Sequence, residues 1–311
     1  MEVRTILAAL TGVAFIGSGG AALANDKIKI GFSQGTMESS WRVNMVEGNK
    51  KYAEENLPDI ELIITNGENN ASKQVSDVES LIAQGVKVLI ISPVTADALT
   101  PVVAQAMSAG IPVVTLDRKV NTDVTLHIGA DNKLIGQSAG KYVCGLLGGK
   151  GNVIEIQGTA GASATIDRHD EFVATIEKEC PEVKIVASQV ANYVREPAIK
   201  FMEDMLQRFK PGEIDLVYAH NDDMALGAVT ALEAAGRLDE VKVVGIDGEN
   251  AAYDAIRDGK MVATFTYHFV APEGIQYGYK VAKGEELPAE IVLPTHQVDS
   301  SNVADFLGKG F

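Results

Sequence analysis

The chain has 311 residues, 22% of them charged, and a formal net charge of −15 at pH 7. This excess of negative charge disfavours nucleic acid or an anionic membrane surface as a partner. The length suits two lobes better than one hydrophobic core.

The first 24 residues have the pattern of a secretory signal peptide. Arg4 lies in a short charged start, residues 6–16 are apolar, and Ala22-Leu23-Ala24 is a small-x-small cleavage site. No cysteine lies at that site, which disfavours a lipid anchor, and no other segment approaches the length of a spanning helix. We expect a periplasmic protein that is cleaved after Ala24 and does not insert into the membrane.

From residue 28 onward, strand patterns and helix patterns alternate. Short apolar runs predict ten strands, at residues 28–33, 61–65, 86–91, 112–116, 153–156, 184–188, 216–219, 241–246, 262–266 and 291–294. Between them, apolar residues recur every three or four positions, as in residues 72–84 and 224–235, and Gly85 and Gly236 supply C-terminal stops. This alternation predicts an α/β fold with parallel sheets flanked by helices.

Ten strands are too many for one comfortable sheet of this kind, so we expect two similar lobes. We place the break near residues 128–131 and interpret residues 125–128 as a crossing segment. Asp131 is expected to cap the helix that follows. No low-complexity linker is present, which predicts a cleft that opens and closes by hinge bending.

The two cysteines, Cys144 and Cys180, each fall late in a predicted helix or just beyond it. The residues leave open whether they form one disulfide or two buried thiols. Two thiols without a nearby His or further Cys do not favour a metal site.

Three predicted strands end directly on polar or charged side chains: residues 113–116 before Asp117-Arg118, 216–219 before His220-Asn221-Asp222-Asp223, and 243–246 before Asp247. In open α/β sheets, ligands bind in the crevice outside the carboxyl ends of the strands. We therefore expect Asp117, Arg118, Asn221 and Asp247 to face a ligand.

Each of these positions also has a structural interpretation. Asp117 and Arg118 could form an ion pair of little energetic value, and Asp247 before a glycine could be a turn residue. Asn221 could cap the next helix; we assign that role to Asp222 or Asp223 instead.

Aromatic side chains near the predicted strand ends and loop starts suit a sugar. Trp41 lies beside Arg42, Tyr193 follows one strand, and Tyr267 follows another. Rings offer flat apolar area to the CH face of a sugar, while carboxylates and guanidinium groups bind its hydroxyls. Trp41 could instead staple its helix to the sheet, but Ser39 ahead of it supplies the cap, which favours the cleft.

Motifs of catalysis and of cofactor binding are missing from the sequence. The five His residues show no metal spacing and are interpreted as ordinary surface or core imidazoles. No H-E-x-x-H, G-x-S-x-G, dinucleotide fingerprint or P-loop appears, and residues 157–163 resemble a phosphate cradle only weakly. The sequence therefore predicts a binding protein without a metal or cofactor, and not an enzyme.

The chain resembles the periplasmic sugar-binding proteins of the ribose-binding type, which deliver ligands to ABC importers. The matching stretches are Ile90-Ile91-Ser92-Pro93, residues 112–118, Glu155-Ile156-Gln157-Gly158, Gly161-Ala162-Ser163 with Arg168, residues 218–227 and residues 243–248. By position, this resemblance implies ligand contacts from Ser92, Asp117, Arg118, Arg168, Tyr193, Asn221, Asp247 and Tyr267.

The resemblance also implies a fold and its domain bounds. Two Rossmann-like lobes would be hinged by three crossovers around a ligand cleft. The N-terminal lobe would contain residues 25–128 and 268–295, and the C-terminal lobe residues 129–267 and 296–311. A membrane ABC permease would be the partner, and a monomer is expected.

The first loop departs from the ribose-binding pattern. It reads Glu38-Ser39-Ser40-Trp41-Arg42, which is similar to the galactofuranose-binding branch. A fork of donors from Arg42 in place of a stacking ring favours a furanose sugar, a sugar acid or a polyol over ribose. We add Glu38, Trp41 and Arg42 to the predicted ligand contacts.

Three other functions remain as alternatives. A glycoside or nucleoside hydrolase would use Asp117 and Asp247 as paired carboxylates, although Arg118 would lower the pKa of Asp117. A sugar-binding ligand for a chemoreceptor would use the same binding chemistry. A sugar-responsive transcription regulator is opposed by the export signal, the acidic charge and the lack of an N-terminal helix-turn-helix.

Overall fold

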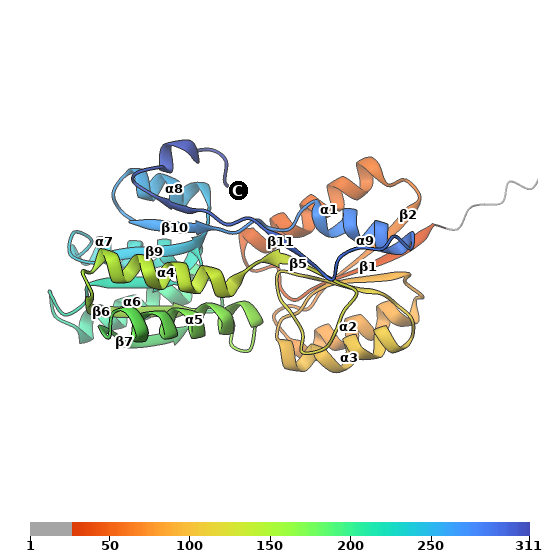
Figure 1. Ribbon diagram of the computed structural model, residues 1–311, viewed down its shortest axis with the longest axis horizontal. Helices are drawn as coiled ribbons and strands as arrows, with labels where there is room; N and C mark the ends of the chain where they lie inside the picture. The colour runs from red at the N-terminus through yellow and green to blue at the C-terminus, as the bar shows by residue number, and fades with distance from the viewer. Residues whose placement is uncertain (1–26) are drawn as a thin grey trace, which may run out of the picture.

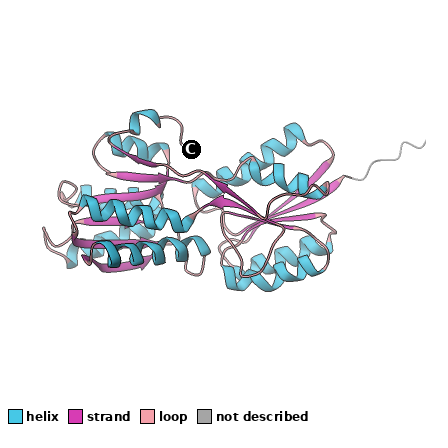
Figure 2. Ribbon diagram, in the orientation of Figure 1, coloured by secondary structure: helices cyan, strands magenta, loops and turns pink. Residues whose placement is uncertain are grey.

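The computed structural model describes residues 27–311, which form two lobes side by side along the longest axis (Figure 1). The predicted signal peptide lies outside the described residues. Each lobe is built on one six-stranded sheet, and helices cover both faces of each sheet (Figure 2). The predicted α/β architecture of two lobes is confirmed.

The first lobe contains the sheet with strand order β11-β5-β4-β3-β1-β2, in which all pairs are parallel. Its elements are β1 (Ile28–Gln34), α1 (Ser40–Asn56), β2 (Ile60–Asn66), α2 (Ala71–Ala83), β3 (Val88–Ser92), α3 (Ala96–Ser108), β4 (Val113–Leu116), β5 (Leu126–Ala130), α9 (Glu273–Ala282) and β11 (Glu290–Leu293). Helices α1 and α9 pack together, as do α2 and α3.

The second lobe contains the sheet with strand order β12-β10-β9-β8-β6-β7, in which only the β10–β12 pair is antiparallel. Its elements are α4 (Asn132–Leu146), β6 (Lys150–Gln157), α5 (Ser163–Glu179), β7 (Glu182–Val190), α6 (Arg195–Arg208), β8 (Leu216–Ala219), α7 (Asp222–Ala234), β9 (Lys242–Asp247), α8 (Asn250–Arg257), β10 (Ala263–Thr266), β12 (Gln297–Asp299) and a 3₁₀ turn (Val303–Asp305).

The chain passes between the lobes three times: from β5 to α4, from β10 to α9, and from β11 to β12. These are the three predicted crossovers. Because they lie side by side at the waist of the molecule, bending at a few backbone torsions can change the angle between the lobes.

Two strands escaped prediction. Residues 125–128, interpreted as a crossing segment, belong mostly to β5, which pairs with β4 and with β11. His127 and Gly129 interrupt its apolar run, but His127 Nδ1 lies 2.9 Å from the Thr115 hydroxyl and so satisfies its polar group inside the sheet. The other missed strand, β12, has three residues at a sheet edge and carries too little pattern to detect.

The sheets are buried because their strands are apolar on both faces. Every residue of β3, β4, β5 and β8 is buried. Each lobe has its own apolar cluster, and a third cluster runs through the waist from Trp41 and Tyr267 to both sheets. Cys144 in α4 and Cys180 at the end of α5 form a disulfide, which resolves the choice that the sequence left open.

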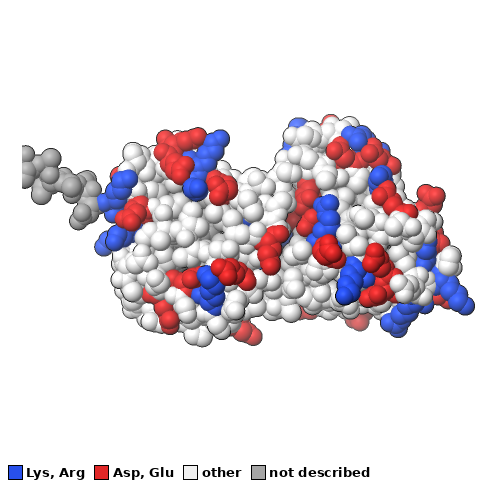
Figure 3. All heavy atoms as spheres, turned by 180° about the vertical axis from the view of Figure 1, so that it is seen from behind, with Lys and Arg blue, Asp and Glu red and all other residues white. Residues whose placement is uncertain are grey.

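Acidic and basic side chains are mixed on the surface. On the face seen in Figure 3, acidic and basic side chains are interspersed on both lobes. The net charge of −15 is therefore not gathered in one acidic patch on that face. Within residues 27–311, no helix combines the length and the hydrophobicity that crossing a bilayer requires.

Candidate binding site between the lobes

A polar cavity lies between the two lobes, at the carboxyl ends of their strands. It contains about 300 Å³ of space, part of it open to solvent. Its lining residues are Ser39, Trp41, Arg42, Asp117, Ala164, Arg168, Tyr193, Asn221, Asp247 and Tyr267. Charged, polar and aromatic side chains from both lobes converge on this space, as they do in small-molecule sites.

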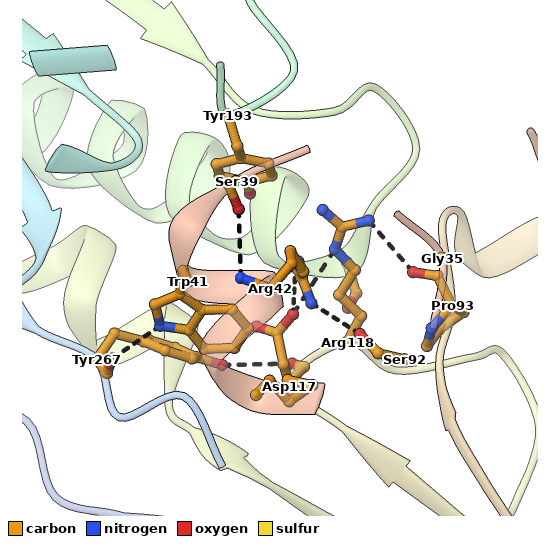
Figure 4. A network of polar contacts seen from close by, with 12 residues as sticks. Gly35, Ser39, Trp41, Arg42, Ser92, Pro93, Asp117, Arg118, Tyr193 and Tyr267 are labelled. Carbon is orange, nitrogen blue, oxygen red and sulfur yellow. Dashed lines mark hydrogen bonds and ion pairs between the residues drawn. The ribbon is translucent and has the colours of Figure 1, made fainter. Parts of the chain in front are cut away.

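The first lobe contributes a wall of ion-paired side chains (Figure 4). Arg42 Nη2 lies 2.6 Å from Asp117 Oδ2, and Arg42 Nη1 donates to the Ser92 hydroxyl at 2.8 Å. Arg118 Nε lies 3.7 Å from the same Asp117 oxygen. The Arg118 Nη1 atom donates to the carbonyl groups of Pro93 and Val94. Much of the donor fork of Arg42 is thus used inside the protein.

These ion pairs decide the charge of Asp117. Burial by itself would raise the pKa of this carboxyl, but the guanidinium groups of Arg42 and Arg118 outweigh burial and lower the pKa. Burial lowers the pKa of Arg118 to about 10, which leaves it charged at neutral pH. The first-lobe wall is therefore a preformed charged network.

Aromatic rings close the sides of the cavity. The Trp41 indole N–H donates to the Tyr267 carbonyl at 3.0 Å, and the two ring centroids lie 5.5 Å apart. Ser39 caps α1 by accepting from the Arg42 N–H, which fixes Trp41 in the first helical turn as predicted. The Tyr193 ring comes from the second lobe and lies 5.3 Å from the Arg118 guanidinium of the first.

Tyr193 can occupy its position only because residue 158 is a glycine. A Cβ on Gly158 would lie 2.0 Å from Cζ of Tyr193. The Tyr193 hydroxyl lies 2.8 Å from the Thr165 hydroxyl, so both the edge and the tip of the ring are fixed. Gly158 therefore shapes the cavity, although it was expected only as part of a family motif.

The second lobe contributes a carboxylate without a partner. Asp247 is 7% exposed, and its side-chain oxygens accept no hydrogen bond and form no ion pair within residues 27–311. Burial raises its pKa well above the usual range, against the lowering effect of Arg168. A buried carboxyl in this state is stabilised when a ligand supplies hydrogen-bond donors.

Arg168 on α5 also faces the cavity. Its Nε donates to Asn132 Oδ1 at 2.8 Å and its Nη1 donates to the His220 carbonyl. The guanidinium carbon lies 4.9 Å from the centroid of the Tyr267 ring. Its Nη2 donates no hydrogen bond within residues 27–311, so one end of the fork is available to a ligand.

The roles predicted for residues 221–223 require a correction. Asn221 itself caps α7, because its Oδ1 accepts from the Met224 N–H at 3.0 Å, and it lines the cavity as well. Asp222 caps nothing in its own helix. Its oxygens accept from the N–H groups of Gly248 and Glu249 and from a threonine hydroxyl, and so hold the loop after β9. Asp223 pairs with Arg195 on the surface.

Three residues that line the cavity have a left-handed backbone. The φ angles are 63° at Asp117, 65° at Tyr193 and 129° at Asp247. Residues other than glycine rarely adopt positive φ, and such strain concentrates at functional sites. The strand ends are therefore bent to turn these side chains towards the cavity.

The two lobes also touch each other directly at the edge of the cavity. The Ala96 N–H at the start of α3 donates to the Gly161 carbonyl at 2.9 Å. The Lys119 N–H donates to the Ser163 hydroxyl at 2.8 Å. The structure is therefore that of a closed form.

Eight of the eleven predicted site residues line the cavity, and three do not. Ser92 and Arg118 lie behind the wall, where they contact Arg42 and Asp117 respectively. Glu38 is exposed, and its carboxylate accepts from the Thr36 hydroxyl. Ser39 and Ala164 line the cavity without having been predicted as contacts. The cap role of Ser39 was a signal for its position, whereas Ala164 in the first turn of α5 carries no such signal.

Metal ligands are not assembled in the part of the chain that the structure describes, where no three His, Cys, Asp or Glu residues are grouped to hold an ion.

The comparisons with known proteins fit this architecture. A model of the periplasmic binding protein domain matches residues 30–286. A ribose import binding protein of Salmonella typhimurium is 35% identical over 272 residues, covering 86% of this chain and 89% of that protein. A galactofuranose-binding protein of Escherichia coli is 38% identical over 245 residues, covering 76% of each chain.

A solved structure of a galactofuranose binding protein is similar throughout. It superimposes with a TM-score of 0.85 at 32% identity and covers 91% of this chain and 98% of its own. The matched family model, the related sequences and the shared two-lobe fold lead to one conclusion: this chain belongs to the family of periplasmic binding proteins.

Proposed function

We propose that this protein captures a monosaccharide or a related polyol in the periplasm and delivers it to an ABC importer. The observation that carries the proposal is the Asp247 carboxyl, which is buried in the wall of the polar cavity between the lobes and has no hydrogen-bond or ion-pair partner within residues 27–311. Vicinal hydroxyls of a sugar would supply the donors that this group lacks.

The chemistry of the walls favours a flat, hydroxyl-rich ligand. Asp247 and the free end of Arg168 would bind hydroxyls from one side, and Asp117 with Arg42 from the other. Trp41 and Tyr193 would cover the CH faces. Much of the Arg42 fork is bonded to Asp117 and Ser92, so we infer that it acts on the ligand chiefly by orienting Asp117.

Binding would close the two lobes, because only the closed form brings both walls to the ligand. Reaching almost complete closure from a mostly open state takes about 5.5 kcal/mol of differential affinity. We propose lobes of residues 25–128 with 268–295 and 129–267 with 296–311. The two separate sheets support a division of this kind, although β5 of the first lobe continues to Ala130. We further propose export with cleavage after Ala24, a monomer, and recognition of the closed form by the membrane permease.

A thermal-shift screen tests the proposal. Purified protein is heated with furanose sugars, pentoses, hexoses, polyols and sugar acids, since a ligand that binds only the folded state raises its stability by mass action. A furanose or polyol at 100 times its Kd should stabilise by about 2.7 kcal/mol. No shift with any compound of these classes would refute sugar binding. The relatives bind ribose and galactofuranose by name, so both belong in the screen.

Hydrolysis is the second candidate, because the two carboxyls have opposite pKa shifts. The pKa of Asp117 is lowered and that of Asp247 is raised, which is how paired catalytic carboxyls divide the roles of base and acid. Binding remains our proposal, because Asp117 is neutralised by two arginines. Turnover of a glycoside that Asp117→Asn abolishes would establish the enzyme instead.

A further inference from the structure

One of the buried carboxylates of the second lobe, Glu155, does not line the cavity. Glu155 is in β6, the strand next to the edge strand β7, where it aligns with Ser188 of β7 and Tyr218 of β8. Its side chain has no exposed area. Burying an ionised carboxylate is unfavourable unless it is well hydrogen-bonded, so we expect hydrogen-bond donors around Glu155.

Four donors surround this carboxylate: His169 Nδ1 at 2.8 Å, His220 Nε2 at 3.1 Å, Ser188 Oγ at 2.7 Å and Gln157 Nε2 at 2.9 Å. Burial alone would raise the pKa of Glu155, but these hydrogen bonds outweigh burial and lower it. Glu155 is therefore a fixed negative charge below the N-terminal half of α5.

The hydrogen bonds of His220 fix its tautomer. Its Nδ1 accepts from the Gly158 N–H at 3.4 Å, so the proton of the neutral ring is on Nε2. That Nε2–H donates to Glu155. The ring is fully buried, and burial lowers its pKa, which keeps it neutral. His220 is thus held at both nitrogens in one orientation.

The backbone of His220 connects this anchor to the cavity. Its carbonyl accepts from Nη1 of Arg168, whose guanidinium lines the cavity. The other tie of Arg168 is the amide oxygen of Asn132, at the start of α4. Of these two hydrogen bonds, the one to His220 connects Arg168 to the negatively charged carboxylate of Glu155.

We propose that Glu155, acting through His220, is the positioning residue that holds the Arg168 guanidinium in the orientation needed for ligand. The inference rests on the sugar-binding function proposed above. Glu155 does not line the cavity, so its effect on binding is through the orientation of Arg168.

The first test is the affinity of Glu155→Gln for a sugar that the wild type binds, measured by titration calorimetry. We expect a loss of about tenfold to 100-fold, the range for a hydrogen bond that involves a charged group. The matched control is Ser188→Ala on β7, which removes a donor to Oε2 of the same carboxylate and leaves the His220 bond to Oε1 in place. Its affinity should stay within about twofold.

A double-mutant cycle separates positioning from general loss of stability. If Glu155 acts through Arg168, then adding Glu155→Gln to Arg168→Lys should change the affinity less than about threefold, because the coupled group is already gone. An equal loss in both backgrounds, or no loss in the single variant, overturns the inference.

Variants of His220 supply an independent comparison if Glu155→Gln does not fold. His220→Gln keeps an N–H that can reach Glu155 and should retain affinity better than His220→Ala by about tenfold. Equal affinities of the two folded variants overturn the inference. Wild-type protein that binds no sugar would refute the proposed function itself, whereas binding that is unchanged by these variants refutes the positioning role alone.

Discussion

The two walls of the cavity differ in how their charges are satisfied before any ligand arrives. On the first lobe, Asp117 is paired with Arg42 and approached by Arg118, so its carboxylate has counter-charges before any ligand arrives. On the second lobe, Asp247 is buried without a partner within residues 27–311, and Asp222 and Glu249 lie close enough to raise its pKa. One wall is preorganised, and the other is incomplete.

This difference indicates which lobe needs the ligand to complete its polar contacts. A paired wall keeps its geometry whether the cleft is open or closed, because its ion pairs stay within one lobe. Within residues 27–311, Asp117 Oδ2 accepts no hydrogen bond, so it can still accept one from a ligand. An unpaired carboxyl gains a partner only when a hydroxyl reaches it, so the free energy of that contact is available to drive closure. Variants of the two walls can test this difference, and the largest effect is expected for Asp117.

Removing the carboxylate from the first wall should damage the fold itself. Asp117→Ala leaves Arg42 and Arg118 buried without their counter-charge, and breaking a buried ion pair in this way costs about 3–5 kcal/mol. Chemical denaturation measures the loss. A free energy of unfolding within about 1 kcal/mol of wild type would show that the first wall does not depend on this ion pair.

Neutralising the second wall should leave the fold intact and weaken binding. Asp247→Asn removes a carboxyl that burial disfavours, so the free protein should be at least as stable as wild type. Its sugar affinity should fall about tenfold to 100-fold, because charge-assisted hydrogen bonds are lost. Calorimetric titration measures the affinity, and a melting curve measures the stability. Lowered stability with unchanged affinity would contradict the proposed difference between the two walls.

The position of Tyr193 can be tested through the glycine beneath it. Gly158→Ala should displace the ring and destabilise the protein by about 1–3 kcal/mol, the usual cost of overpacking, and should also weaken sugar binding. The matched control is Gly145→Ala in α4, where a Cβ meets open space. There, a gain of about 0.5–1 kcal/mol is expected because alanine is the better helix former.

The buried carboxyl of Glu249 in the second lobe should make the stability of the ligand-free protein depend on pH. Burial and the charges of Asp222 and Asp223 raise the pKa of Glu249 from 4.5 to about 8. The folded state then binds more protons than the unfolded state in this range. Its contribution to stability is complete below pH 4.5 and is lost as the pH rises towards 8.

Replacing this carboxyl should flatten the profile. Glu249→Gln cannot titrate, so its melting temperature should fall less than that of wild type between pH 5 and pH 8, by at least about 2 °C. The exposed Glu286 offers the control substitution, Glu286→Gln. Parallel profiles for all three proteins would mean that Glu249 ionises normally in the fold.

Much of the fold could be predicted from the sequence because parallel strands covered on both faces are short apolar runs. The strand ends near Asp117 and Asp247 could be found for the same reason, since ligands gather where such strands stop. What escaped prediction depends on contacts between distant segments. The sequence offered the helix cap and the cavity wall as alternative roles of Asn221, and only the fold shows that one side chain serves both.

The charge states escaped prediction for a related reason. Asp117 and Asp247 look alike in sequence, each at the end of an apolar strand, yet one has two arginine neighbours and the other has none in contact. Burial and partners, not residue type, set their pKa values. The buried Glu155 of β6 shows the same limit, because three of its four partners, His169, Ser188 and His220, come from other parts of the chain.

The hydrogen bonds between the lobes at Ala96 and Lys119 have a consequence for transport efficiency. They join backbone to the facing lobe without involving the cavity, so they stabilise the closed shape even when it is empty. Each is worth about 0.5–1.5 kcal/mol net. The same bonds should tighten the apparent affinity for the ligand, because they favour the closed form. An empty closed protein would, however, compete with ligand-loaded protein for the importer, so these bonds also increase docking that delivers no ligand.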